Sequence, residues 1–262
     1  MNRRMLRRFL LLLAVLTLFC SGQAFAAKKN KWVKKNGYWY YYNSEGKKSK
    51  GLTVIGKKTY YFDDTGKQRV GWRKIGDTYY KFRQKGKTGA YMYTSIKQEG
   101  ITLGKRGRAK LTTLKKKRKA KLLAGYALWA DTFFKTSMTK KQKLNAILKQ
   151  LKKFEYRADS PKIDRKVSWD ISLAELAYAK YASGVKTTYE CYQYAVAYAY
   201  LADAVGFTDV YLQGHPEHAW VEIGGVLYDP TYYFTRHTKA YLPMTEDMID
   251  EYHKYAWRTF IG

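Results

Sequence analysis

Apolar residues at helical spacing mark the second half of the chain. Thr139 and Gln142 have the spacing of a capping box, in which each side chain satisfies a backbone group at the start of a helix. The pattern therefore predicts a helix with one buried face. Its apolar positions are Leu144, Ile147, Leu148, Leu151 and Phe154.

Two further capping patterns predict helix starts. Ser172 and Glu175 begin one of them, and Thr187 and Glu190 precede an alanine-rich stretch in which Gly206 supplies a stop. The second of these helices carries Cys191 in its first turn.

Alternating apolar and polar residues follow this helix. Residues 218–223 alternate like a half-buried strand, Gly224-Gly225 forms a two-residue turn, and residues 226–229 form the returning strand. This register places His218 on the same face as Asp229 and diagonal to it.

The first half repeats with a period of about 20 residues. Each unit predicts a hairpin too small to bury its own aromatic face, so stacked hairpins should form a short β-solenoid. A degenerate fourth unit from Tyr91 to about Gly104 is expected to cap it. The aligned positions are Trp32, Leu52 and Trp72; Tyr40, Tyr60 and Tyr80; Tyr42, Phe62 and Phe82; and Gly46, Gly66 and Gly86.

Charge divides the chain into two parts. Residues 27–121 hold 29 Lys and Arg against 5 Asp and Glu, a net charge of +24, whereas residues 122–262 hold 17 against 16. Residues 105–121 contain ten Lys or Arg and predict a solvated linker, because like charges repel and extend the chain. Two domains of different chemistry are expected, with the linker between them.

The first 26 residues have the pattern of a secretory signal peptide. Four arginines precede an apolar run from Phe9 to Phe19, and Ala24-Phe25-Ala26 supplies small residues at a cleavage site. A lipoprotein built on Cys20 is the weaker alternative, because Phe19 stands where a small residue is usual. Cleavage removes Cys20 and leaves Cys191 without a disulfide partner in an oxidising setting.

The repeats resemble the cell-wall-binding repeats of Gram-positive surface proteins, whose relatives bind choline on teichoic acids or bind glucans. The resemblance implies attachment to a wall polymer, and the positive charge favours an anionic one such as teichoic acid over choline or glucan. Nucleic acid would suit the same charge, but export argues against it. The candidate wall-binding residues are Trp32, Trp39, Tyr40, Tyr60, Trp72 and Tyr80, although a place in the solenoid core is the favoured interpretation for any single tyrosine.

Cys191, His218 and Asp229 supply the residue types of a cysteine nucleophile, a base and an orienting carboxylate. The start of a helix should lower the pKa of the Cys191 thiol, because the positive end of the helix dipole stabilises a thiolate. An ordinary core cysteine would fit the same apolar face. His215 is a competing base, expected in a loop. His237 and His253 lack comparable context, and no metal site or cofactor is predicted.

The order of Cys191 before an alanine-rich helix, His218-Ala219-Trp220 and then Tyr228-Asp229-Pro230-Thr231 resembles the transglutaminase-like superfamily of papain-type cysteine enzymes. The resemblance implies an α+β fold for residues 122–262, with Cys191 as nucleophile, His218 as general base and acid, and Asp229 as the orienting group. Trp220 is a candidate wall of the acyl pocket, but packing behind the hairpin is its favoured role. Tyr189 and Val221 depart from the residues usual in the family, and only one oxyanion donor, the Cys191 N–H, can be named.

These patterns predict a multidomain protein: a signal peptide at 1–26, a wall-binding hairpin solenoid at 27–104, a basic linker at 105–121 and the α+β domain at 122–262. The expected function is that of a secreted, wall-associated cysteine acyl-transfer enzyme, either a peptidase or amidase or a transglutaminase acting on peptide or protein. The alternative is a noncatalytic wall adhesin or scaffold.

Overall fold

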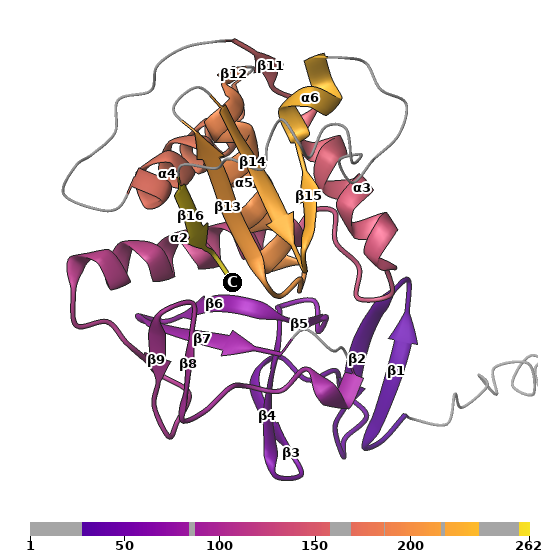
Figure 1. The fold of residues 1–262 in the computed structure, drawn as a ribbon. Helices are drawn as coiled ribbons and strands as arrows, with labels where there is room; N and C mark the ends of the chain where they lie inside the picture. The colour runs from indigo at the N-terminus through magenta and orange to yellow at the C-terminus, as the bar shows by residue number, and fades with distance from the viewer. Residues whose placement is uncertain (1–27, 84–86, 158–168, 186, 216–217, 236–256) are drawn as a thin grey trace, which may run out of the picture.

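The computed structural model describes residues 28–83, 87–157, 169–185, 187–215, 218–235 and 257–262 (Figure 1). The predicted signal peptide, His237 and His253 lie outside these residues. No helix within them is long and apolar enough to cross a membrane.

The 20-residue repeat is a set of antiparallel hairpins, as predicted. They are β1 (Lys31–Lys35) with β2 (Tyr38–Tyr42), β3 (Gly51–Ile55) with β4 (Lys58–Phe62), and β6 (Gly71–Ile75) with β7 (Thr78–Phe82), while the short β5 (Gln68–Arg69) extends the second hairpin. Asn36 and Gly37 both have positive φ in the first turn, the backbone that a tight two-residue hairpin requires. Neighbouring hairpins meet through rings: Trp32 lies 5.1 Å from Tyr60 and Tyr61 lies 5.8 Å from Phe82, centroid to centroid.

A fourth hairpin follows a 3₁₀ turn at Lys87–Gly89. It consists of β8 (Ile96–Gln98) and β9 (Ile101–Leu103), and β10 (Ala109–Lys110) pairs with the free side of β9. The hairpin predicted between Tyr91 and Gly104 is therefore present.

The basic segment 105–121 is not an extended linker. It contains β10 and the first turns of α2 (Leu114–Asp131), whose N-cap Thr113 accepts the Lys116 N–H. The helix forms because its alanines, leucines and lysines are good helix formers. Its lysine-rich first turns lie largely at the surface, whereas residues 122–127 are all buried, so this stretch is enclosed on every side.

Three helices follow: α3 (Lys140–Leu151), α4 (Trp169–Ala182) and α5 (Cys191–Ala204). The capping box of Thr139 and Gln142 is confirmed. The other two predicted caps are wrong, because Ser172 lies inside α4 and the N-cap of α5 is Glu190. Gly206 ends α5 as predicted: its φ is 93°, and its N–H bonds to the Asp203 carbonyl.

One antiparallel sheet packs against α5, which makes this part of the chain α+β (Figure 1). Its strand order is β15 (Val226–Tyr228), β14 (His218–Ile223), β13 (Val210–His215) and β16 (Trp257–Phe260). Ile223 pairs with Val226, which confirms the predicted register of the Gly224-Gly225 hairpin. His215 was expected in a loop, but it ends β13 and pairs with His218.

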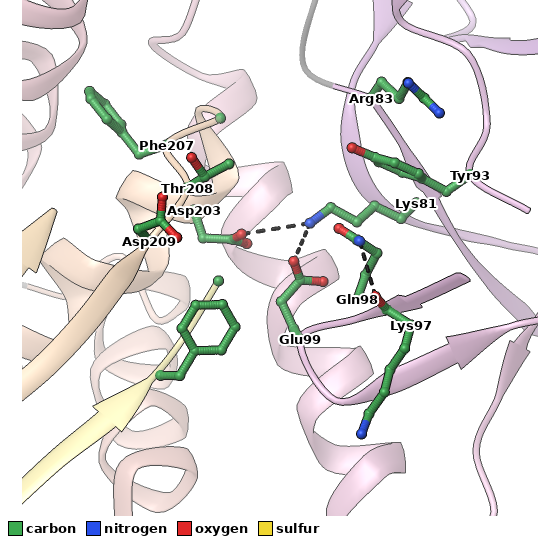
Figure 2. A pocket seen from close by; sticks show the side chains of 13 residues that line it. Lys81, Arg83, Tyr93, Lys97, Gln98, Glu99, Asp203, Phe207, Thr208 and Asp209 are labelled. Carbon is green, nitrogen blue, oxygen red and sulfur yellow. Dashed lines mark hydrogen bonds and ion pairs between the residues drawn. The ribbon is translucent and has the colours of Figure 1, made fainter. Parts of the chain in front are cut away.

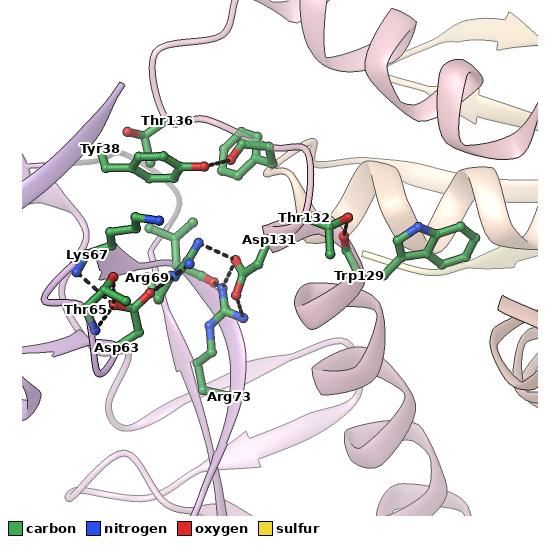
Figure 3. Close-up of polar contacts among 12 residues, drawn as sticks. Tyr38, Asp63, Thr65, Lys67, Arg69, Arg73, Trp129, Asp131, Thr132 and Thr136 are labelled. Atoms are coloured by element: carbon green, nitrogen blue, oxygen red, sulfur yellow. Dashed lines mark hydrogen bonds and ion pairs between the residues drawn. The ribbon is translucent and has the colours of Figure 1, made fainter. Parts of the chain in front are cut away.

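The hairpins and the α+β part share one hydrophobic core. Trp72 on β6 belongs to the same buried cluster as Trp129 on α2. Asp131, at the end of α2, binds Arg73 at 2.9 Å and Arg69 at 3.2 Å (Figure 3). On β7, Lys81 binds Glu99 and lies 3.7 Å from Asp203 near the end of α5 (Figure 2). Because α2 crosses the predicted boundary at residue 122, the two parts pack as one body.

Candidate active site

Cys191 is the first residue of α5. Glu190 caps this helix: its Oε1 accepts the backbone N–H of Gln193 at 3.2 Å, and the side-chain Oε1 of Gln193 accepts the backbone N–H of Glu190 at 3.3 Å. The other oxygen, Oε2, lies 3.6 Å from the Cys191 sulfur. The thiol is 6 % exposed and Glu190 is 7 % exposed. The nucleophile predicted from sequence therefore sits in direct contact with a buried carboxylate.

His218 and Asp229 meet as predicted. Nε2 of His218 lies 2.7 Å from Oδ2 of Asp229. The second oxygen of Asp229 accepts the N–H of Tyr232 at 2.9 Å, at the start of the short α6 (Pro230–Thr235). Asp229 is thus fixed between a helix start and the imidazole, and the contact assigns Nε2 to the carboxylate side of the ring.

The thiol faces the strand that carries His218. The backbone N–H groups of Tyr192 and Ala219 both point to the sulfur and favour its charged form. Ala219 follows His218 on β14, against which α5 packs. The structure therefore brings the three predicted catalytic residues to one end of α5 and to the adjoining ends of β14 and β15.

The pKa of the Cys191 thiol is raised to about 12, first by burial and then by the charge of Glu190. The expectation that the helix start lowers this pKa is wrong for the thiol at rest. Hydrogen bonds from backbone N–H groups lower the pKa of the thiol, but burial and the charge of Glu190 raise it by more. Burial also raises the pKa of Glu190.

Tyr156 is a neighbour of the site that the sequence did not reveal. It lies in β11 (Glu155–Tyr156), which pairs in parallel with β12 (Thr188–Tyr189) just before Cys191. Its side chain is 45 % exposed, and its pKa is raised by partial burial and by the charges of Cys191, Glu190 and Asp229. No local pattern signals this contact, because the strands that create it are distant in sequence.

Trp220 is not an open pocket wall. Its side chain is fully buried, and its Nε1 donates to Gln213 Oε1 at 3.0 Å. The ring lies 6.3 Å from the imidazole of His218, centroid to centroid. Trp220 supports the strand beside His218, and in this structure it offers no surface to a substrate.

The six candidate wall-binding rings differ in exposure. Trp72 is 1 % exposed and its Nε1 donates to Glu99 Oε2, so its assignment as a wall contact is corrected to a core residue. Tyr60 is also buried and donates its hydroxyl to the Thr88 carbonyl. Tyr40 and Tyr80 are buried, whereas Trp32 and Trp39 are partly exposed.

Among the described residues, two cavities lie where the hairpins meet the α+β part. One of about 360 Å³ is lined by residues that include Lys81, Arg83 and Phe207 (Figure 2). The other, of about 250 Å³, lies beside the Arg73–Asp131 ion pair. Neither includes Cys191. No group of three or more possible metal ligands occurs among the described residues.

No model of a protein family matches the chain, and no curated protein matches it. Solved structures with similar parts carry choline-binding repeats. The choline-binding domain of Spr1274 from Streptococcus pneumoniae is 23 % identical, with 32 % of this chain and 98 % of that chain covered and a TM-score of 0.29. Choline-binding protein F from the same organism is 32 % identical over 31 % of this chain and 28 % of that one, with a TM-score of 0.27. The phage Cp-1 endolysin in complex with choline is 23 % identical over 34 % and 26 %, with a TM-score of 0.25. The chain thus spans about a quarter of the length of the last two proteins.

Proposed function

We propose that this protein is an exported, wall-anchored cysteine acyl-transfer enzyme. The observation that carries the proposal is the 2.7 Å contact between His218 Nε2 and Asp229 Oδ2, beside a helix that begins with Cys191. A carboxylate that holds one imidazole nitrogen leaves the other, Nδ1, to take the proton of the nucleophile.

In the proposed reaction, the Cys191 sulfur attacks the carbonyl carbon of an amide while His218 Nδ1 takes the thiol proton. His218 then gives that proton to the leaving amine as the C–N bond breaks, and a thioester remains on Cys191. Water or a second amine resolves the thioester, with His218 as the base. Hydrolysis defines a peptidase or amidase, and attack by an amine defines a transglutaminase.

The developing oxyanion requires hydrogen-bond donors. The Cys191 N–H is one, because the first N–H groups of a helix have no partner within the helix.

The high pKa of the resting thiol is compatible with this reaction. Proton transfer to His218 places an imidazolium beside the new thiolate, and an opposite charge at short range lowers the free energy of the charged form. The thiolate is therefore formed together with the imidazolium.

Wall attachment is assigned to the hairpin repeats. Partly exposed aromatic rings at Trp32 and Trp39 and the net charge of +24 over residues 27–121 support it. One of the similar solved structures is a complex with choline and another was obtained in the presence of a peptidoglycan analogue, which agrees with a partner in the cell wall.

A noncatalytic wall adhesin or scaffold is the second candidate. The buried thiol with a pKa of about 12 favours it, because an inert core cysteine has these properties.

Alkylation of Cys191 separates the two candidates. We expect iodoacetamide to modify the folded protein at pH 7, and His218→Ala to slow this by at least about tenfold with an unchanged circular dichroism spectrum. Modification only after unfolding, at the same rate in both proteins, would support the scaffold.

A further inference from the structure

A basic face lies on the fourth hairpin and its extension. It is formed by Lys97, Lys105, Arg106, Arg108 and Lys110, all of which are exposed. Lys97 and Lys110 both pair with Thr102 of the central strand β9, so the three side chains share one side of the sheet. The opposite side carries Ile101 and Leu103, which are buried. The sheet therefore fixes which way the lysines point.

The loop at the tip of this sheet is held firmly. The Gly104 N–H bonds to the Arg108 carbonyl and the Gly107 N–H to the Gly104 carbonyl, each at 2.9 Å. Gly107 has a φ of 72°, and a Cβ added there would lie 2.5 Å from the sulfur of Met92. Lys105 and Arg106 thus stand on a turn packed against the hairpin. Such preorganisation reduces the entropy lost when the side chains bind a ligand.

Acidic residues do not neutralise this face. Residues 100–130 contain no Asp or Glu, and the nearby Glu99 is buried against Lys81 and Trp72. Within the part of the chain that the structure describes, none of the five basic side chains has a carboxylate partner. Lys115 and Lys117 continue the charge onto the start of α2.

The aromatic rings of the repeats already have cations of this chain over them. Lys34 and Lys87 lie 5.7 and 5.4 Å from the ring of Trp39, and Lys48 lies 4.6 Å from that of Tyr40. A quaternary ammonium ligand would have to displace these lysines and would be repelled by them. The charge and the rings together favour an anionic ligand over a cationic one.

We propose that the basic face binds a linear phosphodiester polymer of the wall, through its phosphates. Among the described residues, the face carries no aromatic ring on which a nucleobase could stack, so it lacks the usual platform for single-stranded nucleic acid. The inference rests on the wall association of the proposed function and is independent of its catalytic part.

The test uses the full mature chain and fluorescein-labelled poly(glycerol phosphate), with binding measured by anisotropy at several NaCl concentrations. One variant replaces Lys105, Arg106, Arg108 and Lys110 with Gln. The control removes the same charge from α3 and its end, by changing the exposed Lys140, Lys141, Lys149 and Lys152 to Gln.

We expect the basic-face variant to bind at least about tenfold more weakly at low salt, and its slope of log affinity against log salt to fall by about three. The control should change by less than about twofold. Equal effects of the two variants, no binding by the wild type, tighter binding to single-stranded DNA of equal charge, or release by choline at matched ionic strength would each overturn the proposal. The rate of Cys191 alkylation is measured in the same proteins. This rate tests the catalytic proposal separately, so that a failure of polymer binding is not mistaken for a failure of catalysis.

Discussion

At the scale of single residues, the contact between the Cys191 thiol and the Glu190 carboxylate sets the chemistry of the site. Replacing Glu190 with Gln keeps an oxygen for the Gln193 N–H and removes the negative charge next to the sulfur. We expect the pKa of Cys191 to fall by at least about one unit, because a like charge at this distance opposes ionisation of the thiol.

The rate of iodoacetamide modification between pH 7 and 10 measures this change, and it should rise about tenfold at a fixed pH in that range. Glu175→Gln is the matched control, since Glu175 pairs with Arg118 on another part of the molecule. An unchanged rate in Glu190→Gln would show that burial alone holds the thiol protonated.

At the scale of elements, the packing of β6 on α2 joins the repeats to the α+β part. Trp72→Ala should lower the free energy of unfolding by about 3–5 kcal/mol, the usual cost of truncating a large buried ring. The melting temperature should fall by the same amount whether unfolding is followed by near-UV or by far-UV circular dichroism, because the core is shared. Leu52→Ala is the control: Leu52 holds the same repeat position but is 43 % exposed, so it should change little. Two separate transitions would contradict a single packed body.

The elements also show what the sequence could predict. The hairpin period, the Thr139 cap and the Gly224-Gly225 register depend on neighbouring residues, and all three were predicted. Helix α2 was missed because its first turns carry the lysines of the basic segment and its buried second half has no one-sided apolar pattern. The caps at Ser172 and Thr187 were misplaced because the capping pattern is short and also occurs away from helix starts. Tyr156 reaches the site through a parallel strand pair that no local pattern encodes.

At the scale of the whole molecule, α5 runs from the candidate active site to the junction with the repeats. Cys191 is its first residue, and Asp203, close to its last, lies 3.7 Å from Lys81 of β7. A helix of this length separates its ends by about 20 Å. The repeats therefore pack at the end of α5 opposite the thiol (Figure 1). If the repeats bind the wall as proposed, the candidate active site faces away from the point of attachment.

Trapping of an acyl-enzyme tests the central claim most directly. The mature protein is mixed with wall peptides, quenched in acid and measured by intact-protein mass spectrometry. We predict a mass increase that maps to Cys191, is absent in Cys191→Ala, and forms at least about a hundredfold more slowly in Asp229→Asn, because Asn removes the charge that stabilises the imidazolium. An adduct that forms equally fast in Asp229→Asn, or no adduct on Cys191 with any wall peptide while the thiol of the folded protein resists alkylation, would contradict the account.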